Sequence, residues 1–148
     1  MFGVNGWGNH SLLDDVYPTA SALPGQGQDP FIVAHLHTYD PWEFCGQNGS
    51  NDAYPGASVI RNSINQALDH AASLGVSVSY GEFGVGRASN NALRDADVVR
   101  EFYKVIAETT TARGASCTPW DDRGWFGLIE PNGNTYRFLY NIVPNMLN

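Results

Sequence analysis

The sequence has few charged residues and almost no lysine. Lys104 is the single lysine among 148 residues, Lys and Arg together number 8 against 15 Asp and Glu, and charged residues make up only 16% of the chain. At a net charge of −7, the chain offers no basic patch that could hold phosphate groups. The composition therefore excludes nucleic acid and anionic membrane surfaces as partners.

Long apolar runs and cysteines are scarce as well. No segment approaches the ~20 apolar residues that cross a membrane, so we expect no membrane partner. Residues 1–7 have neither the charged nor the hydrophobic region of a signal peptide, and we expect none in this chain. Cys45 and Cys117 are the only two cysteines, and they allow one disulfide without requiring it.

The apolar content is sufficient for one globular domain over residues 1–148. Hydrophobic residues make up 43% of the chain and aromatic residues 12%, with four tryptophans. We expect short strands at 2–7, 31–37, 76–80 and 115–119, the second buried on both faces. A capping box at Ser11 to Asp14, a helix through Ile60 and Ala71, and helices at 92–113 and 136–143 are expected between and after them.

Four strand-then-helix units predict an α/β fold with four parallel strands. Four units in 148 residues take about 37 residues each, close to the ~31 residues per unit of an eight-fold (β/α)8 barrel. The chain is therefore expected to form a half-barrel, a (βα)4 domain that is half of a TIM barrel.

The chemically suggestive residues follow the ends of the expected strands. They are Trp7, the pair His37 and Tyr39, then Glu82, and Trp120. In parallel sheets and barrels the functional site lies at this edge. Glu82 is flanked by Gly81 and Gly84, and period-two alternation places it on one strand face with Val78 and Tyr80. A helix-capping or ion-paired Glu is the structural alternative.

These residues resemble the second half of glycoside hydrolase family 5. The motifs are His37-Thr-Tyr39-Asp-Pro41 followed by Trp42, then Gly81-Glu82-Phe83-Gly84, then Trp120-Asp-Asp. The resemblance implies a cellulase-like, retaining hydrolase of β-1,4-linked polysaccharides that acts outside the cell. It makes Glu82 the nucleophile and places His37 and Tyr39 beside it.

The resemblance also assigns the sugar contacts. Trp120 matches the aromatic floor of the subsite next to the scissile bond, and Trp7 is a further sugar platform. Trp42, Trp120 and Trp125 lie in expected loops beside polar residues, where we expect contact with sugar rather than core packing.

The chain departs from the family in one essential residue. The family's acid/base lies in an Asn-Glu motif, and no such pair occurs in this sequence. Retaining hydrolysis needs two carboxyl groups ~5–5.5 Å apart, and only the nucleophile is recognisable. Asp40, Glu43, Asp121 and Asp122 follow strands, but we expect them to be solvated loop charges or turn formers.

His35 and His37 share a strand face and could ligate a metal in principle. A closed metal site needs more ligands, and no Cys/His spacing supplies them, so we expect hydrogen-bonded histidines and neither a metal nor another cofactor.

Two functions remain open. In the first, the chain is a glycoside hydrolase half-barrel. A second copy of the chain in a homodimer, or another complementary half-barrel, completes it. In the second, it is a truncated or engineered, catalytically incomplete half-barrel that at most binds glycans. In both, an open sheet face lined by Val33, His35, Val78 and Tyr80 is expected to drive association.

Overall fold

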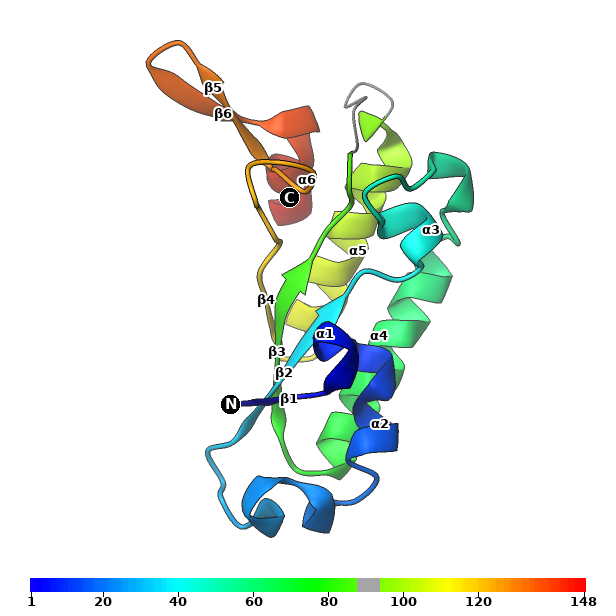
Figure 1. Cartoon of the computed structure of the whole chain (residues 1–148), viewed down its shortest axis with the longest axis vertical. Helices are drawn as coiled ribbons and strands as arrows, with labels where there is room; N and C mark the ends of the chain where they lie inside the picture. The colour runs from blue at the N-terminus through cyan, green and yellow to red at the C-terminus, as the bar shows by residue number, and fades with distance from the viewer. Residues whose placement is uncertain (88–93) are drawn as a thin grey trace.

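The computed structural model describes residues 1–87 and 94–148 (Figure 1). Its main sheet has four strands in the order β1-β2-β3-β4, and every neighbouring pair is parallel. The strands are β1 (Phe2–Gly3), β2 (Val33–Thr38), β3 (Ser77–Phe83) and β4 (Ser116–Cys117). The predicted α/β fold with four parallel strands is confirmed.

Two long amphipathic helices cover one face of this sheet (Figure 1). They are α4 (Ala57–Ser73) and α5 (Asp97–Ala112). α4 presents Ile60, Ile64 and Leu68 to the core, and α5 presents Val99, Phe102 and Ile106. Each central strand of the sheet also contributes a row of buried residues to this core. They are Ala34, Leu36 and Thr38 from β2, and Val78, Tyr80 and Phe83 from β3. The expected start of the second helix at Ala92 lies outside the described residues.

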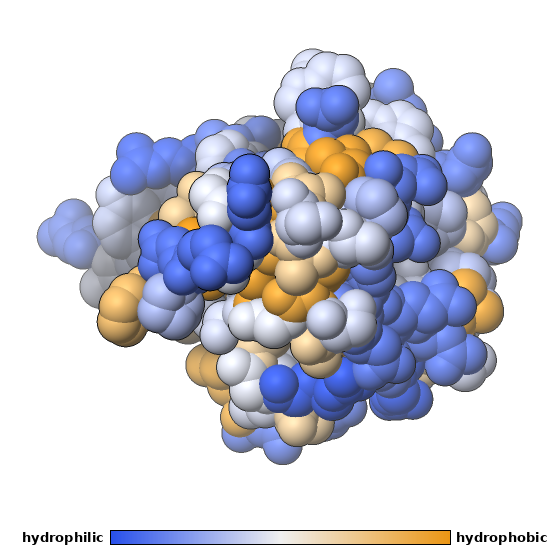
Figure 2. All heavy atoms as spheres, turned by 90° about the horizontal axis from the view of Figure 1, so that it is seen from below, coloured by the Kyte–Doolittle hydropathy of each residue, from blue (hydrophilic) through white to orange (hydrophobic). Residues whose placement is uncertain are grey.

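The opposite face of the sheet is half exposed. In β2 buried and half-buried residues alternate, so the expectation of a strand buried on both faces is wrong, and Phe31 lies exposed before it. Seen from the end at which the strands begin, hydrophobic residues reach the surface between hydrophilic ones (Figure 2). The sheet is thus covered by helices on one side and open on the other.

A bulge in β3 changes which residues face the open side. Leu36 pairs with Tyr80, but His37 pairs with Glu82, so Gly81 is an extra residue in the register. Val78 and Tyr80 therefore point into the core, and Glu82 shares the open face with His37. The prediction that these three residues lie on one face is wrong, because simple alternation cannot detect an inserted residue. The open face carries Val33 and His35, as expected, but Ser79 and Glu82 in place of Val78 and Tyr80.

The segment before β2 is built from short turns. β1 is shorter than expected, because Gly6 and Trp7 take left-handed backbone angles within the turn α1 (Asn5–Gly8). Asn9, and not Ser11, caps the following turn by accepting a hydrogen bond from the Ser11 amide. The remaining short elements before β2 are η1 (His10–Leu12), α2 (Leu13–Val16), η2 (Ala20–Ala22) and η3 (Pro24–Gly27). Two more, α3 (Trp42–Cys45) and η4 (Asn51–Ala53), lie between β2 and α4.

The C-terminal segment contradicts the expected helix from Tyr136. β5 (Ile129–Asn132) and β6 (Thr135–Phe138) form an antiparallel hairpin that stands away from the main sheet (Figure 1). The turn uses Gly133 at φ 60°, and the Asn132-Gly133 pair is a strong hairpin signal. After η6 (Leu139–Asn141), the helix α6 (Ile142–Leu147) starts late and holds Pro144 in its first turn, where proline is tolerated.

Candidate active site

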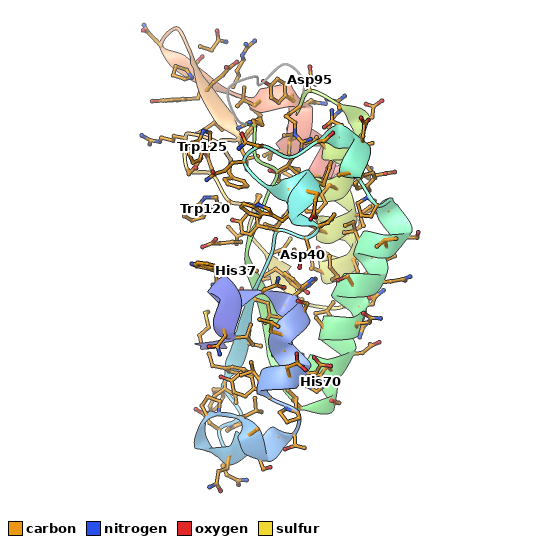
Figure 3. All side chains as sticks on the ribbon, turned by 45° about the vertical axis from the view of Figure 1, so that its right-hand side comes forward. His37, Asp40, His70, Asp95, Trp120 and Trp125 are labelled. Carbon is orange, nitrogen blue, oxygen red and sulfur yellow. The ribbon has the colours of Figure 1, made fainter. Side chains whose placement is uncertain are left out.

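A cleft of about 530 Å³ opens at the carboxyl ends of the parallel strands. It brings together residues from α1, the end of β2, the end of β3 and the loop after β4. The lining residues are Gly6, Trp7, Asn9, His37, Tyr39, Asp40, Trp42, Glu82 and Phe126. Figure 3 shows His37, Asp40, Trp120 and Trp125 along the same side of the molecule, and His70 away from them at the far end of α4.

Glu82 is held by two residues at the end of β2, His37 within the strand and Tyr39 just after it. The Tyr39 hydroxyl donates a hydrogen bond to Glu82 Oε2 at 3.1 Å, and His37 Nδ1 lies 3.7 Å from the same oxygen. Burial and the Glu82 charge both raise the pKa of Tyr39 well above its ordinary value, so the phenol remains a donor. Tyr39 and His37 both contact Oε2 of Glu82, and neither contacts Oε1.

Tyr39 and the histidines are fixed by close packing. Tyr39 meets Phe126 edge to face at 5.2 Å between ring centroids. A Cβ at Gly81 would collide with the His35 ring, so this glycine makes room for His35 over the backbone of β3. His35 and His37 then contact each other, with 3.0 Å between their Nε2 atoms. The expectation of hydrogen-bonded histidines is confirmed.

The tryptophans differ in their relation to the cleft. Trp7 and Trp42 line it and are 94% and 57% exposed. Trp120 is 40% exposed, and its backbone amide donates to Phe83 O, but it is not among the described residues that line the cleft. Trp125 is also exposed. All four rings are accessible, and two of them border Glu82's cleft.

The candidate acids fall into two groups. Asp121 and Asp122 accept hydrogen bonds from backbone amides of their own loop, which makes them turn formers, as expected. Asp40 lines the cleft with Glu82, whereas Glu43 borders neighbouring hollows. Among the described residues of the cleft lining, Asp40 is therefore the one carboxyl group besides Glu82.

His10 is a buried histidine beside Asp40 of the cleft, and the sequence analysis does not predict it as a site residue. His10 Nδ1 lies 2.8 Å from Tyr80 Oη, and its Nε2 lies 3.1 Å from Ser63 Oγ and 3.9 Å from Asp40 Oδ2. Burial lowers the pKa of His10 to about 4, although Asp40 acts in the opposite direction. His10 is therefore neutral at pH 7 and joins η1, β2, β3 and α4 through hydrogen bonds.

Neither cysteine is among the described residues that line the cleft. Cys45 and Cys117 are free thiols, and burial raises the pKa of Cys45. Asn9 and Phe126 belong to the lining without having been predicted. Within residues 1–87 and 94–148 no group of three or more His, Cys, Asp or Glu side chains could hold a metal ion, and no helix there is long and apolar enough to cross a membrane.

The comparisons with known proteins agree with this architecture. The model of the cellulase family, glycosyl hydrolase family 5, matches residues 1–123. No curated protein matches the sequence significantly. Cellulose synthase subunit Z of Clostridioides difficile superposes with a TM-score of 0.75 at 19% identity, over 99% of this chain and 48% of that one.

Two further solved structures are similar. Cel5A of Thermotoga maritima, in complex with cellobiose, gives a TM-score of 0.71 at 16% identity, over 97% of this chain and 46% of that one. A family 5 lichenase from Caldicellulosiruptor sp. F32 gives 0.57 at 26% identity, over 78% and 34%. The chain spans about half the length of the first two structures, and the half-barrel prediction agrees with this coverage.

Proposed function

The chain belongs to glycosyl hydrolase family 5, and we propose that it carries the nucleophile half of a site that hydrolyses β-1,4-linked polysaccharide. The observation that supports this most is Glu82 in an aromatic-lined cleft at the strand ends, with the Tyr39 hydroxyl on one carboxylate oxygen. Polysaccharide is too large to enter a cell intact, so the proposed place of action is outside it.

The proposed chemistry begins with Glu82 Oε1. This oxygen attacks the anomeric carbon, the bond to the leaving oxygen breaks, and a covalent glycosyl ester forms while an acid protonates the leaving group. Water then attacks the same carbon, a base takes its proton, and the Glu82 carboxylate is released. Tyr39 and His37 hold Oε2 during both steps, and Trp7 and Trp42 support the sugar rings.

The acid of the first step and the base of the second are the same carboxyl group in this mechanism. Asp40 is the other carboxyl group of the described lining, and its Oδ2 lies 3.9 Å from His10 Nε2. We propose instead that a complementary half-barrel, either a second copy or another polypeptide, covers the open sheet face and supplies the missing carboxyl group. The half-length match to family 5 structures supports this.

Two identical halves would close differently from the family barrel. The Glu82 carboxylates would then follow the third and seventh strands, diametrically opposed, and we expect them to lie farther apart than the ~5.5 Å of a retaining pair, nearer the ~6.5–9.5 Å of an inverting one. Sedimentation velocity at micromolar concentration tests the association itself. We expect a dimer, because among the described residues the edge strands β1 and β4 pair on one side only and no helix covers the open face. A sharp monomer boundary at all concentrations would refute self-association.

A glycan-binding half-barrel without turnover is the second candidate. It is favoured by the cleft's exposed tryptophans together with the single recognisable catalytic carboxylate. Titration with cello-oligosaccharides should change tryptophan fluorescence, and Trp42→Ala should weaken binding about tenfold, the equivalent of ~1.4 kcal/mol of lost stacking. Phe31→Ala removes an exposed aromatic ring just before β2, at the end of the strand opposite the cleft, and should leave affinity unchanged. Equal losses in the two variants would argue against the cleft as the glycan site.

A further inference from the structure

The imidazoles of His35 and His37 form a pair on the open sheet face, and the proposed hydrolysis does not use His35. Their Nε2 atoms lie 3.0 Å apart. The ring centroids are 4.8 Å apart, and the ring planes make an angle of 80°. The centroids would be farther apart if both rings lay on the straight line through the two Nε2 atoms. The rings therefore meet at an angle. Their hydrogen bond places a proton on one Nε2, and once that proton has moved to Nδ1 of the same ring, both Nε2 lone pairs can bind one ion.

Both rings are held in place by neighbouring backbone. The His35 ring fills the space that a side chain at Gly81 would take, and a Cβ at Gly8 would lie 3.1 Å from the His37 ring. Nδ1 of His35 is buried and has no hydrogen-bond partner among the described residues, so the polar contact of this ring is made through Nε2. The pair is thus positioned before any ligand arrives.

We propose that His35 and His37 form an open two-nitrogen chelate for a late divalent transition-metal ion, Cu²⁺ or Ni²⁺. Metal–nitrogen bonds of about 2.1 Å to atoms 3.0 Å apart enclose an angle of about 90° at the metal. This is the angle between adjacent ligands in square-planar and octahedral sites, which Cu²⁺ and Ni²⁺ adopt, whereas tetrahedral Zn²⁺ prefers a wider one. Water completes the coordination, because the described chain brings no third His, Cys, Asp or Glu ligand to the pair.

The chelate is linked to Glu82 through the other nitrogen of His37. A metal on Nε2 leaves the proton of this ring on Nδ1, which lies 3.7 Å from Glu82 Oε2. Carboxylates that face a ligating histidine in this way orient the ring and strengthen the metal bond. Metal binding therefore draws Glu82 toward His37. This last link bears on the proposed hydrolysis, but the chelate itself does not depend on it.

Calorimetric titration of the folded chain with CuCl₂ and with NiCl₂, in a buffer that does not bind metals, tests the site. We expect one equivalent to bind the unsubstituted chain. His35→Phe should weaken binding by at least about tenfold, since even changes outside the ligand set cost roughly 10–100-fold. His70→Gln is the matched control, because His70 lies on α4 away from the pair, and it should leave affinity unchanged.

Electron paramagnetic resonance of the Cu²⁺ complex identifies the ligands directly. The spectrum of the unsubstituted chain alone tests the site if a variant does not fold. Coupling to two imidazole nitrogens in the unsubstituted chain, reduced to one in folded His35→Phe, is the expected result. Equal affinity of the unsubstituted chain and His35→Phe, loss of binding in His70→Gln, or a spectrum with one or no imidazole nitrogen would overturn the proposal.

Discussion

Glu82→Gln is expected to abolish glycoside cleavage while leaving the fold intact. The amide cannot form the glycosyl ester, and loss of a catalytic nucleophile costs at least about 10⁴-fold in rate. The substitution is nearly isosteric, and an amide still accepts a hydrogen bond from Tyr39. Because it removes a half-buried charge, we expect the free energy of unfolding to be unchanged or higher.

The measurement is the rate of dinitrophenol release from dinitrophenyl β-cellobioside, together with urea unfolding of each variant. Glu108→Gln makes the same chemical change on the exposed side of α5 and serves as the control, with no expected loss of rate. If Glu82→Gln unfolded the chain while the folded fraction kept its activity, Glu82 would be a structural residue and the assignment would be wrong.

The stability of the chain is expected to fall steeply in mild acid because of His10. Burial lowers its pKa from 6.5 to about 4 in the folded chain. Below pH 6.5, His10 binds a proton in the unfolded chain but not in the folded chain. The contribution of His10 to the free energy of unfolding is therefore fully present above pH 6.5 and decreases as the pH falls toward 4. A shift of this size corresponds to a loss on the order of 3 kcal/mol over that window.

Urea unfolding at pH 7 and at pH 4 measures this loss. Other groups also titrate in this window, so the informative quantity is the difference between the unsubstituted chain and His10→Gln. The variant should be less stable at pH 7, because it loses contacts with Tyr80 and Ser63, but its stability should depend less on pH. An equal decrease in both proteins would show that His10 does not carry the effect.

Much of the fold could be predicted because it rests on local periodicity. The apolar spacing of α4 and the short β-branched run before Glu82 both correspond to observed elements. The C-terminal hairpin is not predicted by this periodicity, because Tyr136 and Leu139 fit helical spacing although the Asn132-Gly133 pair between β5 and β6 is a hairpin signal. Where two local patterns compete in this way, tertiary packing decides which structure forms. The spacing of residues in the sequence carries no information about that packing.

The site was predictable only in part for a related reason. Trp7, His37, Tyr39 and Glu82 are expected from their positions at strand ends, and all four line one cleft together with Trp42. Trp120 is expected in the same way but is not among the described residues of the lining. His10 could not be found in this way, because it meets Tyr80 across 70 positions of sequence. The bulge at Gly81, which turns Glu82 to the open face, is likewise invisible to alternation.

We propose that this chain holds a nucleophile, Glu82, without its acid/base. A dinitrophenolate leaving group needs no acid, and azide, unlike water, needs no base to attack the glycosyl ester. We therefore predict that the chain leaves cellulose intact, releases dinitrophenol from dinitrophenyl β-cellobioside in a Glu82-dependent reaction, and with azide turns over faster to give β-cellobiosyl azide. Hydrolysis of cellulose by the chain alone, or dinitrophenol release that neither azide nor Glu82→Gln affects, would contradict the account.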